Sequence, residues 1–207
     1  MEDTYLYRTD ELENAVDYLE KAAFYYNIHD KHRFKWLMIS LHGALYGFGV
    51  CNIKGTSVDN VLNKPKTKNI PEYILKTKQY YKDKFELEID DNFASQIYKY
   101  FHIDILNFGT VINRCKSTDY MTRNIESKIL KLSKKQEEAI EKLKRYRNSM
   151  AHFKPSSYIV TEDYDKEIVI PVIGIIEFLA FETNNVPYDI YDDDFEVRIK
   201  TALGKFG

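Results

Sequence analysis

The sequence predicts an all-α protein with one main domain. Apolar residues recur at helical spacing along most of the chain, and residues that favour helix starts precede several of these runs. The length of 207 residues fits one domain, or one domain with a long insertion. With 44% hydrophobic and 30% charged residues, the composition is that of a globular protein that can form a core without disulfides.

Two helices open the chain, and the second is expected to lie at the centre of the fold. Asp10 begins a capping-box pattern that opens a helix over 10–26. Residues 32–53 form the next helix, which we expect to be central because apolar side chains surround most of its circumference. Gly43 and Gly47 each cost a helix about 1 kcal/mol relative to alanine. They therefore predict the close approach of another backbone.

The remainder of the chain is expected to be helical, apart from one small β-hairpin. Ser133 is the first residue of a second capping box, which opens the clearest helix of the sequence, and this helix should end just before Pro155. β-branched residues over 157–160 and 168–170 predict a hairpin after it. The helix that Ser133 opens covers 134–152. The other helices predicted after residue 53 cover 71–82, 91–101, 103–114, 172–181 and 193–203.

The composition predicts a cytoplasmic protein without a metal or cofactor. Cys51 and Cys115 lie far apart, and neither has the Cys or His spacing of a zinc site, so we expect reduced thiols. The N-terminus is acidic and lacks the apolar region of a signal peptide. No run of eighteen apolar residues occurs, so we expect no membrane partner.

Charge is distributed unevenly along a chain whose net charge is −2. Residues 126–154 hold nine Lys or Arg against four acids, and residues 64–84 hold seven against two. Residues 162–196 reverse the balance, with one Lys against eleven acids. The basic segments are compatible with a phosphate-binding surface, although runs of charge usually form solvated faces. The acidic stretch 184–196 is expected to cover the basic surface 128–147, to recruit a basic partner, or to be a solvated tail.

Residues 145–155, RYRNSMAHFKP, contain the side chains best suited to chemistry. Arg147 falls on the apolar stripe of its helix, where an arginine is costly unless it is paired or faces a site. Asn148 and His152 are four residues apart and share a helix face, so they can hydrogen-bond each other. We therefore take Arg147, Asn148 and His152 as the candidate catalytic residues.

These residue types suit the cleavage of RNA by its own 2′-hydroxyl group, which needs no metal. Histidine suits the two proton transfers because its pKa lies near neutrality. Arginine suits the phosphate because its planar fork can bind two oxygens at once. The requirement for a 2′-hydroxyl would make such a site specific for RNA. Lys144, Arg145 and Lys154 are expected to add contacts to RNA.

Helix geometry limits this interpretation. On a straight helix Arg147 and His152 point roughly 140° apart, so one helix does not aim both at one phosphate. Either the helix end unwinds before Pro155, or a two-fold dimer supplies both residues twice. In a purely structural alternative, Arg147 pairs with a core carboxylate such as Glu177 and His152 only closes the helix. His42 is interpreted as a satisfied core histidine rather than a ligand.

The Arg147, Asn148 and His152 pattern resembles the motif of the HEPN superfamily, the nucleotide-binding domains of higher eukaryotes and prokaryotes. That motif is an arginine, often followed by a polar residue, with a histidine four to six residues later. The runs FKWLMISLHGALYGFGVCNIKGT, RNSMAHFKP and VIGIIEFLAFET look like segments of a group of uncharacterised bacterial HEPN-like proteins. The resemblance covers about 34–56 and 103–183.

The resemblance implies an up-and-down helical bundle that forms homodimers. Residues 1–183 would be the HEPN-like domain, with 57–102 as an insertion, and 184–207 would be an acidic C-terminal tail. It also implies a metal-independent endoribonuclease that acts as a toxin or in antiviral defence. An antitoxin or regulatory protein would be a further partner, besides RNA and a second copy of the chain.

By the same resemblance, Arg147 binds phosphate, Asn148 orients the phosphate or the imidazole, and His152 transfers protons. Two other interpretations stay open at this point. The chain could be a non-catalytic HEPN-like module that binds a protein or nucleotide partner, or a structural dimer without a ligand.

Overall fold

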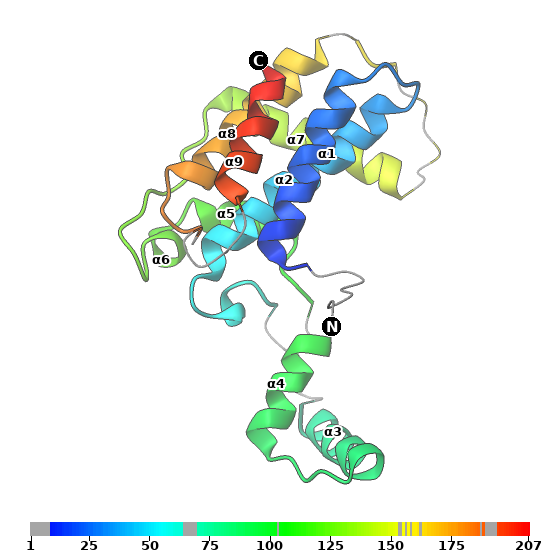
Figure 1. Ribbon diagram of the computed structural model, residues 1–207, viewed down its shortest axis with the longest axis vertical. Coiled ribbons are helices and arrows are strands. Elements are labelled where there is room, and N and C mark those ends of the chain that lie inside the picture. Colours follow the sequence, from blue (N-terminus) through cyan, green and yellow to red (C-terminus); the bar gives the residue numbers. More distant parts are fainter. Residues whose placement is uncertain are drawn as a thin grey trace, which may run out of the picture. The chain divides into compact units, whose positions relative to one another are not determined.

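A computed structural model shows an all-helical protein, which confirms the predicted fold class. Within the described residues no strand forms, and the sole β-type pairing is an isolated bridge between Leu62 and Ile105. The chain divides into two compact units, residues 1–56 with 108–207 and residues 57–107 (Figure 1). The residues that the structure describes are 9–63, 70–102, 104–152, 155, 157, 159–161, 163–186, 188 and 194–207.

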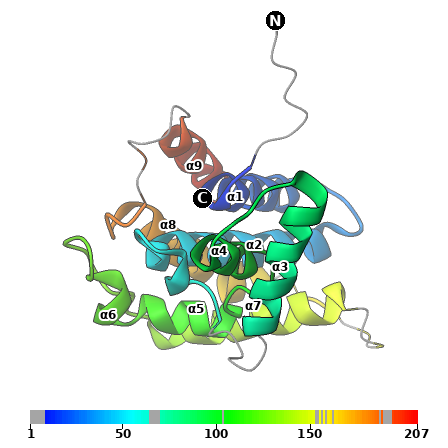
Figure 2. The same ribbon diagram turned by 90° about the horizontal axis from the view of Figure 1, so that it is seen from below.

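The first unit is built on two long helices, α1 (Glu11–Asn27) and α2 (Arg33–Lys54), which lie side by side (Figures 1 and 2). The Asp10 carboxylate accepts the N–H groups of the first turn of α1, as predicted. Gly43 and Gly47 both face α1, and the predicted close approach of a backbone is confirmed at Gly47, which lies against Ala15, whereas the neighbour of Gly43 is a side chain. A Cβ on Gly43 would lie 2.6 Å from the Tyr18 ring, with no room for it unless that ring moved.

Helix α2 is central, as predicted, because further helices pack against it. These are α5 (Phe108–Cys115), α7 (Lys134–Ala151) and α8 (Ile170–Phe181), with the short α6 (Thr118–Met121) beside them. Leu37, Leu41 and Leu45 of α2 are fully buried. Within the described residues, α2 is also the one helix long and apolar enough to cross a membrane. However, 72% of its most apolar window is buried inside the fold.

The predicted β-hairpin is wrong. Ile168 and Val169 belong to a π-helical turn, η3 (Asp165–Val169), and Ile170 begins α8, which follows it directly. The N–H of Ile170 donates to the Asp165 carbonyl, so the helical hydrogen bonds continue up to Pro171, which has no N–H to donate. Ile168 and Val169 are buried, and this packing outweighs the β propensity of their branched side chains. Ser157, Ile159 and Val160 form no strand, and Tyr158 lies outside the described residues.

The C-terminal segment is part of the first unit. Helix α9 (Phe195–Leu203) and the 3₁₀ turn η5 (Gly204–Phe206) pack on α1, and Phe195 and Phe206 are buried. Arg198 of α9 bonds to both Glu13 and Glu20 of α1. Residues 187 and 189–193 of the acidic stretch lie outside the described residues.

The second unit holds η1 (Val58–Asn60), α3 (Ile70–Phe85) and α4 (Asp91–His102). Helices α3 and α4 pack together, and the ring centroids of Tyr73 and Tyr98 are 4.8 Å apart. The predicted helix over 103–114 begins too early, because helical structure starts only at Phe108. Residues 104–106 instead pair with 61–63, through N–H bonds from Leu106 to Val61 and from Asn63 to Asp104.

Candidate functional site

The C-terminal end of α7 holds the predicted site. The Ser133 hydroxyl accepts the Gln136 N–H, and the Gln136 side chain accepts the Ser133 N–H, so the predicted capping box fixes where α7 begins. The helix stops at Ala151, and His152 adopts φ −104° and ψ 15°, outside helical geometry. Its N–H still donates to the Asn148 carbonyl at 3.2 Å. The chain therefore leaves the helix at the histidine, the first of the two arrangements that helix geometry required.

The Arg147 guanidinium connects the three predicted residues. Its Nη1 donates to the Asn148 Oδ1 at 3.0 Å and lies 3.4 Å from the His152 Nε2. A guanidinium has only donors, so this second contact is a hydrogen bond when Nε2 presents its lone pair. Asn148 and His152 thus meet through Arg147, rather than through a direct bond between their side chains.

The cluster is accessible and carries positive charge. Arg147 and Asn148 are half-buried, and His152 is exposed. Within the part of the chain that the structure describes, Arg147 forms no ion pair with a carboxylate, and Glu177 is exposed on α8. No acid there neutralises the guanidinium, and such a group at an open helix end is suited to bind an anion.

His42 of α2 adds a second imidazole near this cluster. It is 7% exposed, and its ring stacks on Phe108 with centroids 4.3 Å apart and planes 31° apart. Burial, and to a smaller extent the Arg147 cation, lowers the pKa of His42 to about 4. The residue is therefore neutral at pH 7 and is a core histidine, in agreement with the sequence interpretation. Its closeness to Arg147 had no sequence signal, because only the packing of α2 on α7 creates it.

The three predicted RNA contacts differ in their surroundings. Lys144 is half-buried, and its Nζ lies 3.6 Å from Glu141, one turn earlier in α7. Arg145 is exposed, with its guanidinium 5.2 Å from the centroid of the Tyr146 ring. Lys154 lies outside the described residues. Both described cations thus lie within one turn of Arg147, but neither takes part in the cluster.

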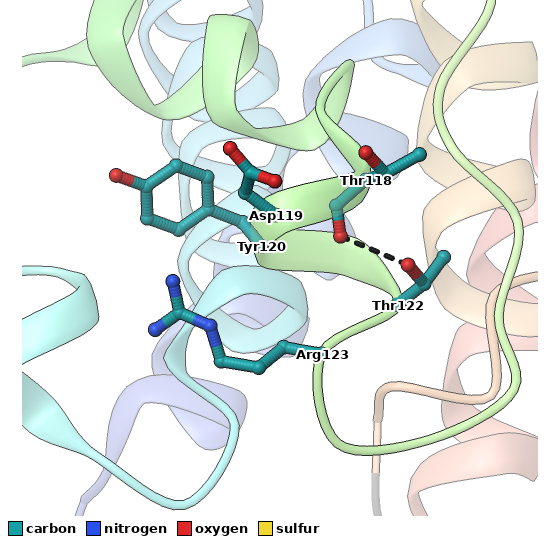
Figure 3. Close-up of a pocket in the computed structure, with 5 residues that line it drawn as sticks. All are labelled: Thr118, Asp119, Tyr120, Thr122 and Arg123. Atoms are coloured by element: carbon teal, nitrogen blue, oxygen red, sulfur yellow. Dashed lines mark hydrogen bonds between the residues drawn. The ribbon is translucent and has the colours of Figure 1, made fainter.

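A second hollow, of about 400 Å³, is lined by residues of α6 and of the turn that follows it. Figure 3 shows the Arg123 side chain turned towards Tyr120, with the guanidinium 5.4 Å from the ring centroid, and the Thr122 hydroxyl bonded to the Thr118 carbonyl. Arg114 approaches the same ring at 4.4 Å. Helix α6 and the C-terminal end of α7 lie at opposite ends of the first unit (Figures 1 and 2), so this hollow is separate from the Arg147 cluster.

Other reactive groups are poorly placed for chemistry. Burial raises the pKa of the Cys51 thiol far above its usual range and that of Cys115 to about 12, so neither forms a thiolate at neutral pH. Among the described residues, no three His, Cys, Asp or Glu side chains gather closely enough to hold a metal ion. The Arg147 cluster is therefore the strongest candidate site.

Comparison of the chain with protein-family models, with curated proteins and with solved structures found no match.

Proposed function

We propose that this protein is a HEPN-type endoribonuclease that cleaves RNA without a metal, as a toxin or a defence effector. The observation that carries the proposal is the 3.4 Å approach of Arg147 Nη1 to His152 Nε2 at an accessible helix end. A phosphate placed there would meet a cation and a proton carrier together, as phosphate transfer requires. Asn148, bonded to the same Nη1, would hold the guanidinium in position.

The reaction would run through the 2′-hydroxyl group of the RNA. A neutral His152 removes its proton, and the oxygen attacks the adjacent phosphorus. Arg147 stabilises the negative charge on the other phosphoryl oxygens. The bond to the 5′-oxygen then breaks, and a protonated imidazole donates a proton to that oxygen. The products are a 2′,3′-cyclic phosphate and a 5′-hydroxyl group.

The mechanism needs an acid and a base at the same time, while each chain contributes one exposed histidine to the cluster. His42 does not fill the second role, because it is buried and neutral. A two-fold homodimer that joins the ends of two α7 helices would supply the second His152. A cell that makes such an enzyme also needs to restrain it, so an antitoxin or regulatory protein is the further expected partner.

The test is cleavage of a single-stranded RNA by the purified chain in the presence of a chelator. We expect cleavage that leaves 2′,3′-cyclic phosphate ends, spares the 2′-deoxy analogue of the same sequence, and falls at least about a hundredfold in His152→Ala. His32→Ala is the matched control, because His32 is an exposed histidine outside the cluster, and it should retain activity. RNA that is bound but left intact would favour the non-catalytic module instead.

A further inference from the structure

A pocket of about 320 Å³ lies between α5 and α7. This volume is at the lower end of the range for small-ligand sites, roughly 300–1,000 Å³. Phe108 and Ile112 of α5 and Ile140 of α7 are apolar residues that line the pocket. The pocket therefore combines polar surface with apolar lining residues and one aromatic residue.

The face of α7 that lines this pocket continues towards the Arg147 cluster. Ile140 and Lys144 both line the pocket, and Arg147 and Asn148 follow Lys144 at the helical spacing of three and four residues. Lys144 and Arg147 are about 4.5 Å apart along the helix axis. A ligand in the pocket would thus lie one helical turn from the group that is suited to bind phosphate.

Phe108 provides a second, independent link between pocket and cluster. Its ring stacks on His42, which lies close enough to Arg147 for the guanidinium to contribute to its lowered pKa. The centroids of the Phe108 and Tyr46 rings are 6.3 Å apart. Contacts with two rings of α2 hold the Phe108 ring in place. A ligand that stacks on this ring therefore does not pay the entropic cost of immobilising it.

The polar rim of the pocket is nearly balanced in charge. Lys116 lies 3.7 Å from Glu137, and Lys144 lies 3.6 Å from Glu141. The rim therefore attracts an anion less than the Arg147 cluster does. Asn113 also lines the pocket, and within the described residues its side-chain amide has no hydrogen-bond partner. An amide offers both donors and an acceptor, which suits the edge of an uncharged heterocycle.

We propose that this pocket is a nucleobase subsite, which stacks on Phe108 the base next to the phosphate bound by Arg147. The inference rests on the proposed function and makes it more specific, because a base in a Watson–Crick duplex is not free to enter the pocket. The substrate class is therefore single-stranded RNA, whose bases can turn out and stack on aromatic side chains.

The test uses the full chain with His152→Ala, so that RNA stays intact during binding. The Kd of a short fluorescent single-stranded RNA is compared with that of an oligomer of the same length that lacks its bases. Phe108→Leu should raise the Kd for the intact RNA roughly tenfold to a hundredfold, as expected for the loss of one stacked base, and leave the Kd for the abasic oligomer unchanged. Phe24→Leu, which removes an exposed ring of α1, should change neither.

Asn113→Ala keeps the proposal testable if Phe108→Leu fails to fold, because Asn113 is exposed. It should raise the Kd for the intact RNA and not for the abasic oligomer. Equal Kd values for the intact and abasic oligomers with the chain that retains Phe108 would overturn the subsite. A folded Phe108→Leu variant whose Kd rises equally for the intact RNA and the abasic oligomer would also overturn the subsite. Base-dependent binding without any cleavage by the wild-type chain would refute the ribonuclease and leave the subsite intact.

Discussion

Gly47 lies so close to Ala15 that a Cβ on Gly47 would fall 2.6 Å from the Ala15 Cβ and 3.0 Å from its Cα. The neighbour is a helix backbone rather than a movable side-chain end, so only a shift of α1 could make room. The packing of α1 on α2, which forms the centre of the first unit, therefore depends on the missing side chain at Gly47.

Gly47→Ala should destabilise the protein by about 1–3 kcal/mol in denaturant unfolding, because overpacking outweighs the helix propensity of alanine. Gly174→Ala is the matched control within a helix. A Cβ there would meet only Gln136 at 3.9 Å, so this change should raise stability by up to about 1 kcal/mol. A Gly47→Ala variant as stable as Gly174→Ala would contradict the close packing.

Arg198→Ala should loosen the C-terminal helix from α1. Arg198 bonds to both oxygens of Glu13, at 2.8 and 3.0 Å, and to both oxygens of Glu20, at 2.8 and 2.9 Å. These groups are partly exposed, so we expect a loss of about 1–2 kcal/mol in thermal or denaturant unfolding, between the values for surface and buried pairs. Lys21→Ala, which removes an exposed pair with Asp17, should have almost no effect.

The same variant should change how stability depends on acid. The hydrogen bond from Arg198 lowers the pKa of Glu20 in the folded protein. A carboxyl group whose pKa is lowered by folding stabilises the fold at any pH above its unfolded pKa. This stabilisation is lost as the pH falls through the pKa of the folded state. Arg198→Ala should therefore cost more at pH 7 than below pH 4, and an equal cost at both would exclude the coupling.

His42 should make the stability of the fold depend on pH over a higher pH range than Glu20 does. Its pKa is about 4 in the fold against 6.5 as the ordinary value, so the unfolded chain binds more protons between these values. Stability is then complete above pH 6.5 and falls as the pH drops towards 4, by roughly 3 kcal/mol for this residue. His42→Phe, which keeps a ring against Phe108, should remove this slope in urea titrations, whereas His29→Phe, at an exposed position, should retain it.

Mixing of subunits should show whether two copies of His152 share one site. If both are required, a dimer with one His152→Ala chain is inactive, and equal amounts of wild-type and variant chains leave about one quarter of the dimers active. Independent sites would leave about one half of the activity instead. Cleavage rates after co-refolding, with His32→Ala as the mixing control, distinguish the two. A value near one half would exclude the shared site.

Local patterns in the sequence were enough to predict several of the helices and the residues of the candidate site. Apolar periodicity and caps predicted α1, α2 and α7, and two glycines in α2 predicted the close approach of another backbone, because these features depend on neighbouring residues of one helix. That this backbone belongs to α1 was decided by the tertiary structure. The choice of Arg147, Asn148 and His152 also came from one segment. The structure brings these three together, although their catalytic role stays a prediction.

Only the tertiary structure decided the features that join distant segments. The β-branched residues 168–170 became helical because burial against the core outweighed their local preference, and the expected helix start at 103 moved to Phe108 because 104–106 pair with 61–63. The contact between Arg147 and His152 depends on where α7 stops. The stacking of His42 on Phe108 exists only because α2 and α5 pack together, and such long-range packing has no signature in local sequence.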